Sequence, residues 1–307
     1  MISKYTYQGL TWVDLESPTR EEIETIRDEY ALPSVVTQEL YTETLRSKVD
    51  LYDNLIYLVL HFPVLSGLPS IAQPDQEIDF IIGEKFFITI RYSHISSVYE
   101  FAKLFEATSL LNRGIGEKHA GYLFAFLIRE MYSQLDKELD HVNESLRFIE
   151  NKIFEGQEEK MVRTISETNR KLLDFKQALR FHGDILHSFE GASKNFFGGE
   201  FCDYLATVVI GEYNKLRSLV DSHKEILDDL RETNDSLVST KTNETMRTLT
   251  IMTFVMLPIT LITGVFGMNT SSKLVFIQDI RDFVFIVAAM TLTGLTVFFF
   301  FKIKRWI

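Results

Sequence analysis

Hydrophobic and polar residues alternate differently along three consecutive parts of the chain. In the first part, short alternating runs typical of strands occur at 5–7, 11–15, 54–62, 78–82 and 86–92, and helical spacing occurs at 34–42 and 97–110. Gly83-Glu84-Lys85 separates the last two runs by the spacing of a β-hairpin. Ser17 followed by Pro18 predicts a helix with Ser17 as its N-cap. These patterns predict an α/β domain over residues 1–116.

The second part, residues 117–247, has helical spacing almost throughout. Charged helical patterns cover 117–154 and 158–189, and a loop is expected at 191–200. From 201 to 257 the chain has no proline and a single glycine, Gly211, which predicts one long helix. Steps of three and four predict a coiled-coil seam along this helix, formed by Leu216, Leu219, His223, Ile226, Leu230, Thr233 and Leu237. We therefore expect a helical stalk domain.

The third part, residues 248–307, contains two long stretches without charge. The first covers 25 residues, 248–272, and the second covers 19 residues, 283–301. About 20 apolar residues cross the bilayer hydrocarbon, so we expect a two-helix transmembrane hairpin. Its spans are predicted at about 248–266 and at 283–301, with an outer loop at 267–282. The alternative is a pair of buried helices in a soluble core, which the nearly uniform apolar character of the second stretch disfavours.

The distribution of charge changes what the overall composition suggests. The 307 residues carry a formal net charge of −11, with 46% hydrophobic residues and one cysteine. Residues 243–307 carry +3, so the first 242 residues carry −14. An acidic body argues against nucleic acid as a partner, because phosphate binding needs a positive surface. A single cysteine allows neither an intrachain disulfide nor a CxxC zinc site.

Lysine and arginine residues set the expected orientation of the hairpin. The connecting loop contains only Lys273 and Arg281, whereas five such residues flank the hairpin on the side of the termini, namely Lys241, Arg247, Lys302, Lys304 and Arg305. Short cytoplasmic segments carry the excess of positive residues. We therefore expect a multi-pass protein of the cell membrane with both termini in the cytoplasm.

A stripe of mostly small or hydroxyl-bearing residues runs into the first span with the same spacing of three and four. It consists of Asn243, Met246, Thr250, Thr253, Leu257, Thr260, Gly264 and Gly267. When several copies of a helix pack around a common axis, the residues of such a stripe face that axis. This arrangement favours the interpretation that the stripe lines a pore. The alternative is close helix packing through small residues. One hairpin cannot enclose a pore, and both interpretations require a homo-oligomer.

Motifs for other chemistry do not occur in the sequence. It contains no GxxxxGK[ST], GxGxxG or HExxH pattern, and its seven histidines show no paired ligand spacing. We therefore expect that the protein is not an enzyme and has no resident cofactor.

The first span ends at Gly267-Met268-Asn269, after which a short loop, a second span and a basic end follow. With Glu77-Ile78-Asp79-Phe80-Ile81-Ile82-Gly83 before a strand and Lys241-Thr242-Asn243-Glu244 before the span, this arrangement resembles the CorA-type magnesium transporter family. The resemblance implies a homopentameric funnel whose long helices line one pore. Five copies of Gly267, Met268 and Asn269 would form the selectivity filter, where Asn269 binds the hydrated metal ion. The implied cargo is Mg²⁺, with Co²⁺ and Ni²⁺ as further ions.

Other residues receive roles within this expected pore. Met246, Leu249 and Leu257 would form apolar constrictions able to gate by dewetting. A ring of Glu232 or Asp235 near the inner mouth would attract cations, and the alternative for these acids is an ordinary solvated helix face. Members of the family bind regulatory Mg²⁺ between subunits, so the transported ion would also regulate.

The expected outer loop departs from the family pattern. Thr270-Ser271-Ser272-Lys273-Leu274 follows the filter, and no acidic residue occurs before Asp279. Magnesium transporters of the family usually carry an aromatic residue and then an acidic loop, whereas a ring of Lys273 would repel divalent cations. A ZntB-like zinc transporter is therefore one alternative. A non-conducting, membrane-anchored structural or sensing oligomer is another.

Overall fold

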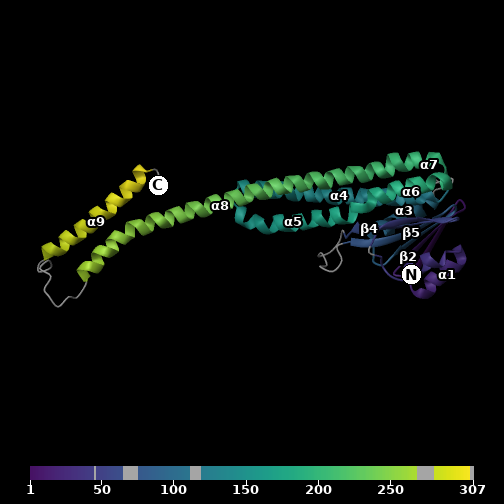
Figure 1. The fold of residues 1–307 in the computed structure, drawn as a ribbon, viewed down its shortest axis with the longest axis horizontal. Helices are drawn as coiled ribbons and strands as arrows, with labels where there is room; N and C mark the ends of the chain where they lie inside the picture. Colours follow the sequence, from purple (N-terminus) through teal and green to yellow (C-terminus); the bar gives the residue numbers. More distant parts are fainter. Residues whose placement is uncertain (45, 65–74, 111–118, 268–279, 305–307) are drawn as a thin grey trace. The chain divides into compact units, whose positions relative to one another are not determined.

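The computed structural model describes residues 1–44, 46–64, 75–110, 119–267 and 280–304. The chain divides into two compact units, Met1–Arg231 and Glu232–Ile307 (Figure 1). The predicted boundary at 116 lies outside the described residues, and the predicted boundary at 247 lies within a helix. The three-part division of the chain stays a prediction.

The first unit is built on one mixed six-stranded sheet with the order β1-β2-β6-β5-β4-β3. Its strands are β1 (Ile2–Tyr7), β2 (Leu10–Glu16), β3 (Lys48–Leu51), β4 (Leu55–Pro63), β5 (Asp75–Gly83) and β6 (Phe86–Arg91). Strands β2 and β6 are parallel, and the other neighbouring strands are antiparallel. Ile82 pairs with Phe87, which confirms the predicted hairpin. The short, half-exposed strand β3 was not predicted.

Helices cover both faces of the sheet, because strand residues alternate between the two sides. An aliphatic face with Val13, Leu15 and Ile81 packs against α1 (Arg20–Tyr30) and α2 (Ser34–Glu39). The opposite face is aromatic and packs against α3 (Ser96–Leu110) and α4 (Gly121–Phe154). There the Trp12 and Phe101 ring centroids are 5.2 Å apart, and those of Phe80 and Phe124 are 5.3 Å apart. Figure 1 shows the strands between α1 and the longer helices.

The N-cap of α1 is Thr19, so the prediction of Ser17 was wrong. The Glu22 amide donates to Thr19 Oγ1 at 3.3 Å, and the Thr19 amide donates to the Glu22 carboxylate at 2.9 Å. This reciprocal capping box satisfies two amides that the helix leaves without partners. Ser17 instead has a φ of 44°, and its hydroxyl donates to the Tyr92 carbonyl at 2.9 Å. A second cap two residues later, with Glu22 three positions beyond it, outcompetes the Ser-Pro pair.

The described residues after α4 are almost entirely helical. They comprise α5 (Glu158–Ala178), a 3-10 turn η1 (Leu179–Phe181), α6 (His182–Phe197), α7 (Gly199–Tyr204), a π-helical segment η2 (Leu205–Ile210), α8 (Gly211–Gly267) and α9 (Ile280–Ile303). The structure contradicts two predictions: η1 interrupts the helix expected at 158–189, and the loop expected at 191–200 is helical except at Gly198, whose φ is 92°.

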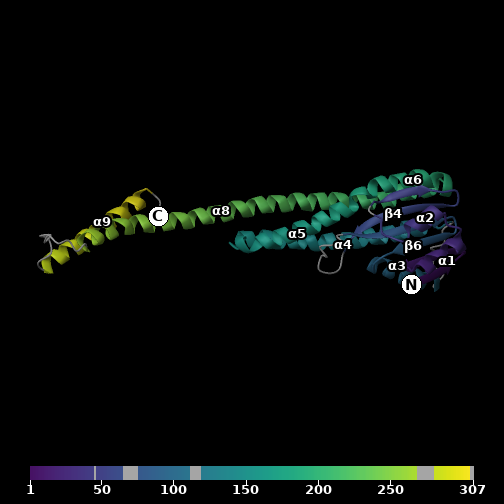
Figure 2. The ribbon, with the colours of Figure 1, turned by 60° about the horizontal axis from the view of Figure 1, so that its bottom comes forward.

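The long helix predicted from 201 is present, and it continues past Pro258 to Gly267. Helices α4 and α5 run side by side in both views (Figures 1 and 2).

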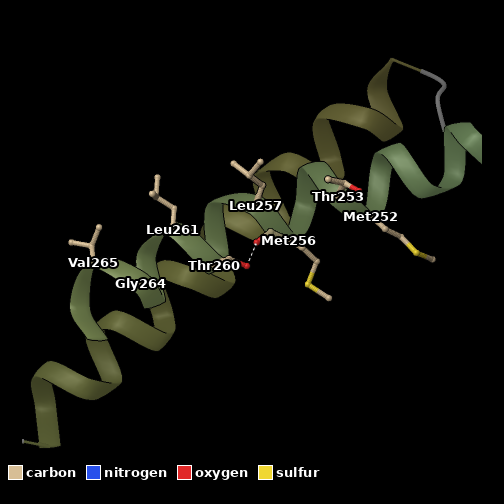
Figure 3. Close-up of a pocket in the computed structure, with 8 residues that line it drawn as sticks. All are labelled: Met252, Thr253, Met256, Leu257, Thr260, Leu261, Gly264 and Val265. Carbon is tan, nitrogen blue, oxygen red and sulfur yellow. Dashed lines mark hydrogen bonds between the residues drawn. The ribbon is translucent and has the colours of Figure 1, made fainter. Parts of the chain in front are cut away.

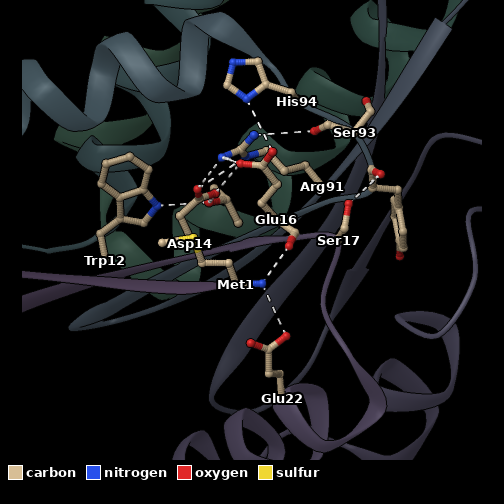
Figure 4. Close-up of polar contacts among 11 residues, drawn as sticks. Met1, Trp12, Asp14, Glu16, Ser17, Glu22, Arg91, Ser93 and His94 are labelled. Atoms are coloured by element: carbon tan, nitrogen blue, oxygen red, sulfur yellow. Dashed lines mark hydrogen bonds and ion pairs between the residues drawn. The ribbon is translucent and has the colours of Figure 1, made fainter.

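A buried ion pair joins the parallel strands β2 and β6. Arg91 Nη2 lies 2.9 Å from Asp14 Oδ2, and the two side chains are 4% and 8% exposed (Figure 4). Thr89 Oγ1 donates to Asp14 Oδ1 at 2.7 Å, and Trp12 Nε1 donates to Thr89 Oγ1 at 3.1 Å. The guanidinium also reaches Glu16 at 2.8 Å. The charges of Asp14 and Arg91 are thus both compensated inside the unit.

Replacing Arg91 with Met should destabilise the fold strongly, because Asp14 would remain buried without its cation. We expect a loss of about 3–5 kcal/mol in the free energy of unfolding, measured by denaturant titration. Arg163→Gln is the control, because Arg163 forms an exposed pair with Glu167 and its removal should cause no measurable change. Equal stability of the two variants would contradict this role of Arg91.

Candidate functional site

Two helices of the described residues are long and apolar enough to cross a membrane. The first is the continuous helix that ends with α8, and the second is α9, with mean hydropathies of 2.1 and 2.3 in their most apolar windows. Only 6% of each window is buried within the chain. A helix of a soluble core would be mostly buried, so this exposure favours the membrane interpretation over a soluble core.

Helix α9 packs on one side of α8 within the second unit. The Phe254 and Phe301 ring centroids are 5.9 Å apart, and Ile251 of α8 and Phe301 of α9 are both buried. Gly294 lies against Ile259, since a Cβ atom added at Gly294 would be 3.3 Å from Ile259 Cδ1. The missing side chain at Gly294 therefore lets the two helices approach closely.

The predicted stripe lies along the side of α8 that these contacts leave open. Thr253, Leu257, Thr260 and Gly264 all line one open groove of about 870 Å³ (Figure 3). Four larger side chains complete the lining and were not predicted, namely Met252, Met256, Leu261 and Val265. The prediction followed a single line of residues spaced three and four apart. It missed these four because the open face of the helix is wider than that line.

The threonine hydroxyls of the stripe donate within their own helix. Thr250, Thr253 and Thr260 each donate to the carbonyl four residues earlier, at 2.7, 2.9 and 2.9 Å. Figure 3 shows this bond from Thr260 to the Met256 carbonyl. Each hydroxyl hydrogen is thereby used, and the oxygen lone pairs are left as acceptors. The stripe is therefore suited to accept hydrogen bonds from water.

Other predicted site residues precede or follow this groove along the sequence. Asn243, Met246 and Leu249 are exposed on α8, as are the acids Glu232 and Asp235. Gly267 is the last residue of α8. Met268, Asn269 and Lys273 lie outside the described residues. Within the described ranges, no group of three or more His, Cys, Asp or Glu residues is placed to hold a metal ion.

The part of α8 in the first unit buries a line that only partly matches the predicted seam. The buried residues are Tyr213, Leu216, Val220, His223 and Leu227, again with steps of three and four. Of the predicted residues in this stretch, Ile226 is 42% exposed and Leu219 is half-buried. The predicted seam therefore mixes two neighbouring lines of residues on the helix. One line packs within the chain, and the other is partly exposed.

A family comparison decides the class of protein. Residues 7–305 match the family described as CorA-like Mg²⁺ transporter protein. The chain belongs to this family. It therefore belongs among membrane transporters of divalent metal ions, and its N-terminal α/β part, long helix and two C-terminal apolar helices confirm the fold predicted for a single chain.

Individual relatives agree with this assignment. The CorA-family chain is 22% identical over 302 residues to the cobalt/magnesium transport protein CorA of Thermotoga maritima, covering 97% of this chain and 83% of that protein. The structure of the CorA magnesium transporter from Methanocaldococcus jannaschii aligns with a TM-score of 0.78 at 18% identity, covering 99% and 94% of the two chains. The ZntB cytoplasmic domain from Vibrio parahaemolyticus is more distant, with a TM-score of 0.53 at 14% identity, covering 77% and 88%.

Replacing Gly294 with Leu should separate the two apolar helices, because the new side chain overlaps Ile259. We expect a loss of about 1–3 kcal/mol, seen as a lower melting temperature of the full-length protein in detergent. Thr291→Leu, at an exposed position of α9, is the control. If both leucines lowered the melting temperature equally, the close contact at Gly294 would not hold the helices together.

Proposed function

We propose that the chain forms a homopentamer that conducts divalent cations, foremost Mg²⁺ and also Co²⁺ and Ni²⁺, through a central pore lined by α8. Family membership supports the class of cargo, and the Thermotoga relative is named for the transport of cobalt and magnesium. The observation that supports the pore is the open, hydroxyl-bearing face of α8 opposite its contacts with α9. We propose no enzymatic activity and no resident cofactor.

The proposed face suits an ion that keeps its water. Mg²⁺ gives up its octahedral water shell reluctantly, and the protons of that water point outward toward acceptors. Thr253 and Thr260 would offer acceptor oxygens within the span, and Gly267 and Asn269 would offer theirs in the outer filter. No acidic residue occurs between Arg247 and Asp279, so no carboxylate would trap the ion.

The apolar members of the face would act as gates. Met246, Leu249 and Leu257 are 57%, 58% and 59% exposed in one chain. Around a shared axis, rings of such side chains would exclude water when they are close together, which stops ion flow without any charge. Glu232 and Asp235 would concentrate cations at the inner mouth, because rings of acids attract them.

The exposed line of α8 supports assembly of several copies. Leu219 and Ile226 belong to the spacing of a seam, but in a single chain Leu219 is only half-buried and Ile226 is exposed. We propose that they contact a neighbouring subunit. The proposed orientation has both termini in the cytoplasm of a cell-membrane protein, because Lys302 and Lys304 directly follow the second span.

Replacing Thr260 with Val tests the role of the hydroxyl. The change keeps the shape but removes the acceptor oxygen, so Mg²⁺ uptake into proteoliposomes should fall roughly two- to tenfold, the value of about one hydrogen bond. Thr296→Val on α9 removes a hydroxyl of the same kind, bonded to the Leu292 carbonyl, and should leave uptake unchanged. An equal loss of uptake in both variants would show that the Thr260 hydroxyl has no specific role in the ion pathway.

Replacing Asn269 with Ala tests the proposed filter. Mg²⁺ uptake should collapse while the oligomer persists, as measured by ion flux and by mass in detergent. Uptake by the unaltered protein that never exceeds empty vesicles for Mg²⁺, Co²⁺, Ni²⁺ or Zn²⁺ would instead support a non-conducting oligomer. Zn²⁺ outcompeting Mg²⁺ would support the ZntB-like alternative, for which the basic Lys273 in the outer loop is the sequence argument.

A further inference from the structure

Two carboxylates lie buried side by side on β5. Glu77 and Asp79 are 4% and 0% exposed, and they share one face of the strand because they are two residues apart. The strand register places His61 of β4 opposite Glu77, and Val59 opposite Asp79. This is the aliphatic face of the sheet, covered by α1 and α2. Neither carboxylate belongs to the proposed pore.

Asp79 receives its hydrogen bonds from two tyrosines. The Tyr57 hydroxyl donates to Oδ1 at 3.1 Å, and the Tyr92 hydroxyl donates to Oδ2 at 2.8 Å. Both donors are neutral, so they satisfy the oxygens of Asp79 without balancing a charge.

Glu77 is only half satisfied. Its Oε2 accepts the Thr44 amide at 2.5 Å and lies 3.4 Å from His61 Nε2. That imidazole nitrogen is closer to the Thr44 carbonyl, at 2.9 Å, while Nδ1 lies 3.0 Å from Ser47 Oγ. The other carboxylate oxygen of Glu77, Oε1, is buried and has no hydrogen-bond partner in the described part of the chain. One acceptor in this cluster therefore lacks a donor.

Within the described residues, His61 is the group beside Glu77 that can become positive, whereas the tyrosines that bind Asp79 are neutral. Besides His61, the ionisable groups acting on the cluster are the acids Asp75, Glu39 and Glu43 and the two tyrosines. The nearby cation Lys48 is engaged with Glu39 and, at 2.7 Å, with Asp50. Two unbalanced carboxylates in an apolar layer would be unfavourable. A single proton removes one charge and provides the missing donor.

The titration behaviour of the cluster agrees with this geometry. Burial, followed by the charge of Glu77, raises the pKa of Asp79 from 3.8 to about 8, against the opposing effect of the tyrosine hydroxyls. Burial lowers the pKa of His61, but hydrogen bonds with Glu77 and with the Thr44 backbone outweigh it, and the net shift is upward.

We propose that Glu77 and Asp79 together bind one proton, held as a hydrogen bond from the Asp79 carboxyl group to Glu77 Oε1. The pair is a proton-binding site, distinct from the ion pathway. It makes the folded state of the Met1–Arg231 unit sensitive to pH. The sheet is also tied to the helices here, because His182 Nε2 of α6 lies 2.8 Å from the His61 carbonyl and the Tyr132 hydroxyl of α4 lies 2.8 Å from His182 Nδ1.

The sign of the pH dependence follows from proton linkage. Asp79 holds its proton more tightly in the folded chain than in the unfolded one, where its pKa returns to an ordinary value near 3.8. The unfolded chain therefore releases this proton first as the pH rises. The contribution to stability is complete at acid pH and is lost progressively between about pH 4 and pH 8.

Infrared spectroscopy of the full-length protein in detergent tests for the shared proton. We expect the carbonyl band of a buried carboxylic acid at pH 6, fading as the pH rises above about 8. Asp79→Asn and Glu77→Gln should both lack this band, since each supplies an amide donor in place of the proton. Asp53→Asn, at an exposed position, should retain it. Absence of the band in the unaltered protein would overturn the proposal.

Thermal unfolding across pH is the second measurement. Between pH 6 and pH 8 the melting temperature of the unaltered protein should fall by roughly 5 °C more than that of Asp79→Asn. Asp53→Asn should follow the unaltered protein. Equal pH slopes in all three proteins would contradict the proposal, and a slope that moved with Mg²⁺ or EDTA would assign the site to a metal cation. If Asp79→Asn did not fold, Glu77→Gln gives the same comparison.

Discussion

A hydrated divalent cation can cross hydrocarbon only along a surface that accepts hydrogen bonds from its water, and the proposed pathway depends on whether α8 provides one. The hydroxyls of Thr250, Thr253 and Thr260 donate back to their own helix, which leaves their oxygens as acceptors. This arrangement adds polarity to an apolar span without adding charge. A carboxylate there would bind the ion too tightly to release it, and an all-apolar face would hold no water.

Helix α8 is buried by different neighbours along its length. In the first unit, Tyr213, Leu216 and Leu227 are buried among other side chains of that unit. In the second unit, α9 covers the side with Ile251 and Phe254, and the threonine side remains open. An exposed apolar face with polar members is unstable in water, so α9 and the last part of α8 need lipid around them, and the proposed pore would add neighbouring copies.

Features that depend on local composition and spacing could be predicted from the sequence. Features that depend on competition between two possible caps, or on which side chains become buried, could not. The spans follow from long runs without charge, and the stripe follows from its spacing. Ser17 is a residue type that often caps helices, but Thr19 caps this helix because Glu22 completes its capping box. The sequence Leu179-Arg180-Phe181 contains no glycine or proline that would predict the interruption of the helix there. A spacing of three and four residues fits both the buried and the partly exposed line of residues on α8, so the spacing alone could not tell which line is buried.

The carboxylate pair shows the same limit. Asp79 lies within the strand predicted at 78–82, but Glu77 lies just before that range, and alternation alone does not tell which face of a strand is covered. Only the packing of α1 and α2 places them inside, and only the tyrosine and amide contacts leave Glu77 Oε1 without a donor.

The most direct test of the central claim is cysteine accessibility along α8. Single cysteines would be placed at 251, 253, 255, 257, 259, 260, 262 and 264 in a Cys202→Ser background, since Cys202 is the one native cysteine. A charged thiol reagent should block Mg²⁺ uptake at 253, 257, 260 and 264 and spare the other four positions, with Mg²⁺ protecting the reactive ones. Block without this periodicity, or confined to 251, 255, 259 and 262, would contradict a pore lined by the open face of α8.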